Sequence, residues 1–160
     1  MADGRQLAVI VIRLLAATLM GAAIGFEREQ AGKSAGLRTH ILVTLGTTVF
    51  VLSCSAYGMN SDGLSRVIQG ITTGIGFIGA GTILKLSDEG YIKGLTTSAG
   101  IWMAAAIGVT IGLGAIGLAV LATILTVVIL SVTLSLEKKI GSSQHAEKPD
   151  DAKTGDSNRK

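Results

Sequence analysis

Residues 94–136 read GLTTSAGIWMAAAIGVTIGLGAIGLAVLATILTVVILSVTLSL and contain no Lys, Arg, Asp or Glu over 43 consecutive positions. As one helix this stretch would be about 64 Å long, roughly twice the thickness of the hydrocarbon core of a bilayer. It therefore has to reverse direction, and its central glycines mark the natural place for a turn. The stretch predicts two membrane-spanning helices, over residues 95–110 and 114–136.

Three further apolar segments precede this stretch. Residues 7–26 are interrupted only by Arg13, and residues 39–58 and 67–84 carry no charged side chain. Each is close to the roughly 20 residues that a helix needs to cross a bilayer. The fold class expected for residues 1–136 is therefore an all-α membrane protein, a bundle of five transmembrane helices in a lipid bilayer.

Composition supports a membrane protein and excludes several other classes. The chain has 160 residues, of which 48% are hydrophobic and 16% charged, whereas soluble domains carry about 25% charged residues. Cys54 is the single cysteine, so neither an internal disulfide nor a thiolate metal cluster is expected. The net charge of +3 comes from basic residues that flank the apolar segments, and we expect no nucleic-acid binding.

The two ends of the predicted bundle differ in charge. With the N-terminus outside, the inner segments hold Arg28, Lys33, Arg38, Lys85 and Lys93, and the start of the tail adds Lys138 and Lys139. The outer segments hold Arg5 and Arg66. Short loops rich in Lys and Arg stay in the cytoplasm, which favours an outside N-terminus and a cytoplasmic C-terminus. Residues 137–160 contain few apolar side chains and are predicted to form a disordered cytoplasmic tail.

Glycines recur at four-residue spacing inside the predicted helices. This spacing puts both glycines of a pair on one helix face, where a neighbouring backbone can approach closely. The pairs are Gly21 with Gly25, Gly70 with Gly74, and Gly108 with Gly112. They predict helix packing, within one chain in our preferred interpretation and between copies in a homo-oligomer as the alternative.

Gly74, Gly76 and Gly79 also fit the Gly-x-Gly-x-x-Gly pattern of dinucleotide-binding loops. That pattern needs a preceding strand, and the surrounding apolar segment predicts a helix. We therefore expect no cofactor. Gly76, Gly79 and Gly81 are instead predicted to thin their helix for close packing.

Arg13 lies about two turns inside the first predicted helix, at a depth where charged groups are costly and therefore functional candidates. Two interpretations stay open. Arg13 pairs near the outer end of the third helix, with Asp62 or with a carbonyl group and Gln69, or its guanidinium reaches the outer headgroups. The predicted outer polar group comprises Arg13, Asp62, Arg66 and Gln69.

A second polar group is predicted at the cytoplasmic face, where two helices begin. Helix N-termini carry unpaired N–H groups and partial positive charge, which suits anions or carboxylates. The group comprises Glu27, Arg28, Arg38, Thr39, His40, Thr96 and Thr97. It is either a recognition surface or ordinary capping by Thr39 and Thr96, with Glu27 paired to Arg38.

A short internal similarity links these two helix starts. GLRTH at residues 36–40 resembles GLTTS at residues 94–98, and each follows a glycine-rich helix. The similarity suggests two parallel repeats, each of two helices, with the fifth helix outside them. Chance similarity is the alternative.

Four blocks carry a resemblance to a known family. In chain order they are RLLAATLMGAAIGFERE (13–29), AGLRTHILVTLG (35–46), SRVIQGITTGIGFIGAGTILK (65–85) and GLTTSAGIWMAAAIGVTIGLG (94–114). Together they resemble the membrane domain of the MgtC/SapB family. The family pattern commonly has an acidic residue three positions before the arginine of the third block, whereas here Asp62 lies four positions before Arg66.

The resemblance implies a bacterial inner-membrane protein linked to adaptation to low magnesium and, in pathogens, to survival inside macrophages. It also implies an action on other membrane machinery, such as ATP synthase or transporters. The classical members carry a cytoplasmic C-terminal domain, and the short segment after residue 136 leads us to expect a member with the membrane domain only.

Three classes of function are compatible with the residues. A non-enzymatic regulator that binds another membrane protein is favoured, because no serine, cysteine or histidine has an evident base with an orienting partner. A small transporter or channel for Mg²⁺ or another ion is the alternative, although no predicted helix carries a mid-membrane carboxylate and no metal site is expected. A lipid-modifying enzyme holding phosphate with Arg28, Arg38 and His40 lacks a base and a nucleophile.

Overall fold

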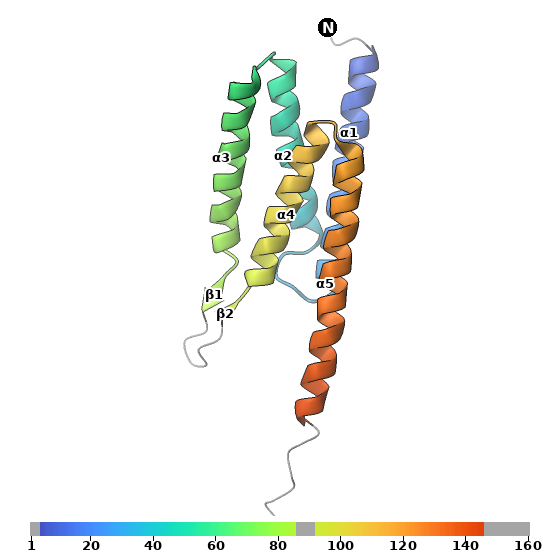
Figure 1. Ribbon diagram of the computed structural model, residues 1–160, viewed down its shortest axis with the longest axis vertical. Helices are drawn as coiled ribbons and strands as arrows, with labels where there is room; N and C mark the ends of the chain where they lie inside the picture. The colour runs from blue at the N-terminus through green and yellow to red at the C-terminus, as the bar shows by residue number, and fades with distance from the viewer. Residues whose placement is uncertain (1–3, 86–91, 146–160) are drawn as a thin grey trace, which may run out of the picture.

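The computed structural model describes residues 4–85 and 92–145, with side chains over residues 4–83 and 92–132. Within these ranges the chain is all-helical apart from two very short strands, as the apolar pattern predicts (Figure 1). The helices are α1 (Gly4–Gln30), α2 (Leu37–Ala56), α3 (Ser61–Ala80), α4 (Leu95–Gly112) and α5 (Ile116–His145).

The helices lie side by side along the long axis of the molecule (Figure 1). At the upper end of Figure 1, α1 begins, α2 leads into α3, and α4 turns into α5. At the lower end, α1 leads into α2 and α3 leads into α4. We call these ends of the bundle the upper end and the lower end.

Three of the helices, α1, α2 and α4, are long and apolar enough to cross a bilayer, and residues 116–132 of α5 form a shorter apolar helix. Their lipid-compatible surface is extensive, since large apolar side chains such as Leu19 (69% exposed) and Leu42 (68% exposed) point away from the bundle. α3 is not among these three helices, and its N-terminal part carries the charged residues Asp62 and Arg66. The chain thus has the helices of a membrane protein. That α3 and α5 also span the membrane stays a prediction.

Two helix boundaries differ from the sequence-based expectation. α3 begins at Ser61, ahead of residue 67, because the Asn60 side chain accepts a hydrogen bond from the Gly63 N–H at 2.9 Å and caps the helix. α5 continues to His145, into the segment predicted as tail from residue 137. The loss of apolar residues does not end it, because Glu and Lys are good helix formers. The remainder of the predicted tail, residues 146–160, lies outside the described residues.

α3 ends at Ala80, before the expected end of the third span at residue 84, and an antiparallel pair of two-residue strands, β1 (Leu84–Lys85) with β2 (Ile92–Lys93), joins it to α4. The pair ends at Gly94, which has φ +98° and is the N-cap of α4. A Cβ atom there would lie 2.9 Å from the Thr82 carbonyl carbon, so only glycine fits this crossing of the chain. Both GLRTH and GLTTS place their glycine at the N-cap and their leucine at the first helical position.

The core consists of α2 held between glycine faces of α1 and α4. A Cβ atom added to Gly21 would lie 2.8 Å from the His40 carbonyl oxygen, and one added to Gly25 would lie 2.7 Å from the Leu37 Cα. On α4, Gly108 touches the Thr44 backbone, and a Cβ at Gly112 would lie 2.6 Å from the Val51 Cβ. Two of the three glycine pairs therefore let helices of the same chain approach closely.

Buried threonines of α2 fill the space that these glycines leave. Thr44, Thr47 and Thr48 are each at most 4% exposed. Their hydroxyls donate to carbonyl groups of α2 itself, and Thr48 Oγ1 also lies 2.8 Å from the Gly108 carbonyl oxygen of α4. Hydroxyls paired in this way can be buried in an apolar bundle without an unsatisfied polar group.

The third glycine pair has a different environment. Gly70, Gly74 and Gly76 have nothing within 4 Å of an added Cβ atom, which corrects their predicted packing role within the chain. The reason is helix register, because α3 packs on α4 through Ile71 and Ile75, and through Gly79 where an added Cβ would meet the Ser98 hydroxyl. Gly81, just past the end of α3, contacts only the backbone of the preceding helical turn.

We predict that Gly108→Ala destabilises the fold by about 1–3 kcal/mol, because the new methyl group overlaps the Thr44 carbonyl and the Thr47 hydroxyl. The measurement is unfolding by SDS titration in mild detergent, followed by circular dichroism. Gly46→Ala on α2 is the matched control, since nothing lies within 4 Å of its added Cβ, and it should leave stability unchanged or slightly raised. Equal stability of the two variants would contradict this account of the core.

Candidate functional site

Arg28 is the most deeply buried charged residue in the described part of the chain and forms the centre of the candidate site. It follows Gly21 and Gly25 at helical spacing, so it shares the α1 face that packs on α2. Its side chain is 1% exposed. Two guanidinium nitrogens bond to the carboxylate of Glu27, one of them at 2.7 Å, and Nη2 also approaches the Leu130 carbonyl oxygen of α5 at 3.4 Å.

The bidentate contact neutralises Arg28 within its own helix. Glu27 therefore pairs with Arg28 and not with Arg38, which is exposed on α2. The physical reason is the register of α1, which buries the guanidinium and leaves the adjacent carboxylate as the nearest group able to compensate a buried charge. This corrects the pairing expected from sequence.

His40 is a second buried polar residue at the lower end, with no exposed surface. Its Nδ1 atom lies 2.9 Å from the Gly36 carbonyl oxygen one turn earlier. Its Nε2 atom points toward α4, 3.4 Å from where a Cβ at Gly100 would lie, and has no hydrogen-bond partner among the described residues. The histidine is thus enclosed between two helices, with one ring nitrogen available for a hydrogen bond.

Glu29 caps α2, a role that the sequence analysis had given to Thr39. Glu29 Oε2 accepts a hydrogen bond from the Leu37 N–H at 2.9 Å, whereas the N-cap residue Gly36 offers no side chain for the purpose. At the start of α4 the N-cap is Gly94, also without a side-chain hydrogen bond, and Thr96 is exposed while Thr97 is buried. The tight α1–α2 connection lets the carboxylate fold back onto the next helix, which spacing alone does not reveal.

The predicted outer polar group is not brought together. Arg13 Nη1 donates to the Gly112 carbonyl oxygen at the end of α4, at 2.8 Å. Asp62, Arg66 and Gln69 are exposed on α3, which packs on α2 and α4 on the other side of the bundle (Figure 1). The partner of Arg13 is therefore a carbonyl group, as one interpretation expected, but it belongs to α4 and not to the third helix.

A family pattern described as the MgtC family matches residues 14–139. The chain belongs to the MgtC family. The putative magnesium transporter YhiD of Escherichia coli K12 is 43% identical over 133 residues, which cover 78% of this chain and 60% of YhiD. The protein SrpB of Synechococcus elongatus is 43% identical over 130 residues, covering 74% of this chain and 71% of SrpB.

The protein MgtC of Salmonella typhimurium is 46% identical over 116 residues, covering 72% of this chain and 48% of that protein. The chain thus spans about half to three fifths of the length of YhiD and MgtC. No solved structure matches. The matched part contains the Arg28 cluster, His40 and both glycine pairs that hold α2.

Within the described ranges, no group of three or more His, Cys, Asp or Glu side chains is placed to hold a metal ion. The cluster at the lower end instead has one compensated guanidinium, one enclosed imidazole and one capping carboxylate, held by hydrogen bonds of α1, α2 and α5. The bonds of Arg28 to α5 and of Glu29 to α2 help to fix the positions of these three helices, and the buried guanidinium would be costly without its partners.

Removing the Glu27 carboxylate tests this arrangement. We predict that Glu27→Ala lowers the free energy of unfolding by about 3 kcal/mol, because the guanidinium of Arg28 stays buried without its counter-charge. Arg38→Ala removes an exposed charge from the same end and should change stability by less than about 0.5 kcal/mol. If both substitutions have the same effect in SDS titrations, Glu27 and Arg28 do not form a stabilising buried pair.

Proposed function

We propose that this protein is a non-enzymatic regulator of other membrane machinery in the bacterial inner membrane, and that α3 docks a transmembrane helix of its target. The resemblance to the MgtC/SapB family supports adaptation to low magnesium as the setting, with ATP synthase or transporters as the class of target. The observation that carries the proposal is the bare glycine pair of α3.

A groove of about 610 Å³ lies between α2 and α3 and passes along this glycine pair. Its lining is almost entirely apolar and includes Phe50, Val67, Gly70, Ile71, Gly74 and Phe77. Phe77 is 84% exposed, the highest value among the large apolar side chains of the described residues. A helix seated here would find close backbone contact at the glycines and an aromatic ring at the edge.

The two other glycine pairs show what this kind of surface does in the same molecule. Gly21 with Gly25, and Gly108 with Gly112, are each covered by α2 so closely that an added Cβ would overlap it. The α3 pair has the same spacing, but no described atom lies within 4 Å of a Cβ added to either glycine. Since lipid chains cannot match the fit of a helix to such a face, a protein helix is the expected occupant.

Ion transport is the second candidate function, favoured by the name of one relative, the putative magnesium transporter YhiD. Mg²⁺ binding usually uses one or two carboxylates with retained water. The described acidic residues lie near the ends of helices, where Glu27 is paired with Arg28 and Glu29 caps α2. The engagement of these two carboxylates supports the regulator as our preferred proposal.

The distribution of Lys and Arg supports an orientation with the upper end outside the cell and the lower end in the cytoplasm. Arg28, Lys33 and Arg38 gather around the α1–α2 connection at the lower end. In this orientation the α3 groove lies within the membrane, and the Arg28 cluster lies at the cytoplasmic side.

Photocrosslinking tests the docking face. With p-benzoylphenylalanine in place of Phe77, we expect a crosslink to a different membrane protein in native membranes, identified by mass spectrometry and by antibodies to ATP synthase subunits. Gly74→Leu should reduce the crosslink at least fivefold by filling the groove. Gly76→Leu should not, because Gly76 faces open space outside the groove.

Two results would contradict the proposal. One is a crosslink only between differently tagged copies of this chain, which would assign the face to a homo-oligomer. The other is Mg²⁺ flux in proteoliposomes of the purified protein that is lost in Asp62→Ala, a substitution of an exposed residue, which would establish transport instead.

Cysteine labelling tests the orientation. In a Cys54→Ala background, Tyr57→Cys at the upper end should react with a membrane-impermeant maleimide added to cells with a permeabilised outer membrane. Lys33→Cys should react only after lysis. Tyr57 is 83% exposed, so failure to react cannot result from burial in the fold. The reverse labelling pattern would invert the assignment of the two ends.

A further inference from the structure

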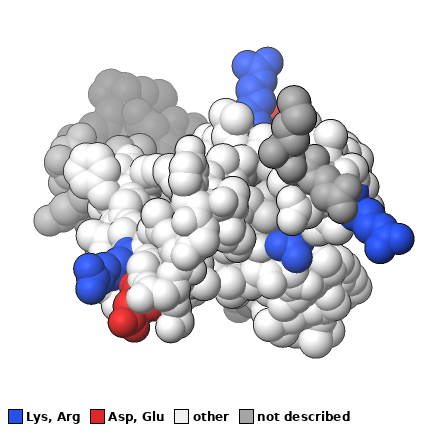
Figure 2. All heavy atoms as spheres, turned by 90° about the horizontal axis from the view of Figure 1, so that it is seen from above, with Lys and Arg blue, Asp and Glu red and all other residues white. Residues whose placement is uncertain are grey.

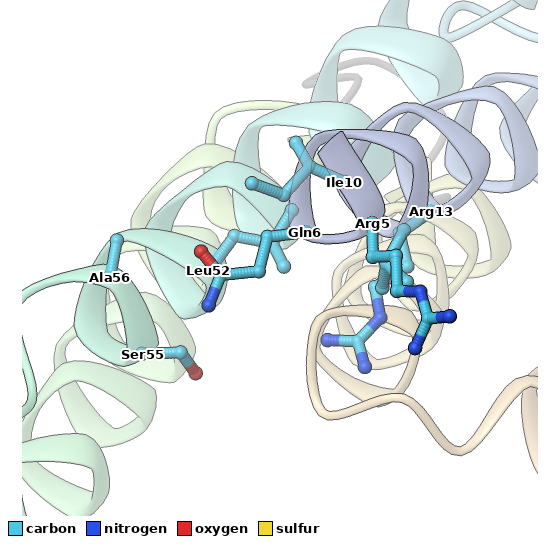
Figure 3. Close-up of a pocket in the computed structure, with 8 residues that line it drawn as sticks. Arg5, Gln6, Ile10, Arg13, Leu52, Ser55 and Ala56 are labelled. Atoms are coloured by element: carbon cyan, nitrogen blue, oxygen red, sulfur yellow. The ribbon is translucent and has the colours of Figure 1, made fainter. Parts of the chain in front are cut away.

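A second groove lies at the upper end, between α1 and α2, and encloses about 570 Å³. Figure 3 shows Arg5 and Arg13 projecting from the same side of α1, while Gln6 faces Leu52 and Ser55 of α2. The α4–α5 turn lies below the upper ends of α1 and α2 (Figure 1).

Arg13 lines this groove and is held in place by the end of α4. Its Nη1 donates to the Gly112 carbonyl oxygen at 2.8 Å. A Cβ at Gly114, which has φ +88°, would lie 2.6 Å from Nη2, so the guanidinium occupies the place where any other residue would put a side chain. A guanidinium has five N–H donors, and this contact uses one of them. Arg13 is thus pre-positioned and retains donors for a ligand.

Arg5 is the second cationic group of the groove. It precedes Arg13 by eight residues on the same helix face, about 12 Å along the axis. Arg5 is exposed, and its side chain is free to close over a bound group.

The described residues that line the groove include no Asp or Glu. Figure 2 looks down on the upper end and shows mainly uncharged surface with a few separated basic side chains and, at the lower left, an acidic group beside a basic one. In a partly desolvated site, two arginines without a counter-charge attract an anion, and the planar guanidinium suits the oxygens of a phosphate.

The remaining lining tells which phosphate compound fits. Ile10 and Leu52 make the wall between the helices apolar, and Gln6 and Ser55 add hydrogen-bonding groups near the rim. Inorganic phosphate would leave the apolar wall uncovered. A phospholipid would place its phosphodiester between the arginines, its glycerol at the polar rim and the start of an acyl chain along the wall.

We propose that this groove binds the phosphate of an anionic glycerophospholipid in the leaflet at the upper end of the bundle. The inference is independent of the regulator function, since it rests on a different groove. A lipid bound here would be linked through Arg13 to both α1 and the α4–α5 turn.

Native mass spectrometry of the full chain in mild detergent tests the site. With added phosphatidylglycerol we expect one lipid retained per chain, with an affinity at least tenfold higher than for phosphatidylcholine. Arg5→Gln should lower the affinity for phosphatidylglycerol at least fivefold. Arg66→Gln is the matched control, because Arg66 is an exposed arginine at the same end that does not line the groove.

Arg13→Lys provides a second variant that keeps one charge and one donor for the Gly112 carbonyl. It should fold, as judged by circular dichroism, and should bind phosphatidylglycerol more weakly than the wild type. Equal loss of binding in Arg5→Gln and Arg66→Gln would overturn the proposal in favour of general attraction to a basic surface. Displacement of the lipid by millimolar inorganic phosphate would overturn it in favour of a free-phosphate site.

Discussion

The packing of the α2 threonines between two glycine faces is the constraint on which the rest of the structure depends. A membrane offers little hydrophobic force for bringing helices together, so their association relies on close fit and on hydrogen bonds. Here Gly21 and Gly108 remove the side chains of α1 and α4 at the level of Thr44 and Thr48. The Thr48 hydroxyl then reaches the Gly108 carbonyl of the neighbouring helix.

This close approach also determines where charge can be placed. Because Gly21 and Gly25 press α1 onto α2, the next position on the same face, Arg28, is carried into the interior and needs its own counter-charge. At the other end of α1, Arg13 reaches the end of α4 for the same reason, since α2 holds both helices at short range. The buried Arg28 and the part-buried Arg13 are therefore consequences of one helix face.

The helices themselves could be predicted from hydropathy, and the spacing of glycines indicated which faces suit close packing. The partners of polar groups could not, because they depend on helix register. Arg13 finds its acceptor at Gly112, in a helix that sequence alone does not place beside it. Glu29 caps α2 only because the connection after α1 folds back tightly. Nothing in the repeated Gly-xxx-Gly spacing separates the covered pairs from the bare pair of α3.

The glycine face of α3 is packed much less closely than the glycine faces of α1 and α4. α1, α2 and α4 are joined by close backbone contact at their glycines and by an interhelical hydrogen bond, whereas no described atom lies within 4 Å of a Cβ added to Gly70 or Gly74 of α3. An element with few close contacts can shift at small cost in free energy. A target helix bound to α3 would thus change the position of α3 without disturbing the α2 core, and a difference in affinity between two positions of α3 is what a regulator requires.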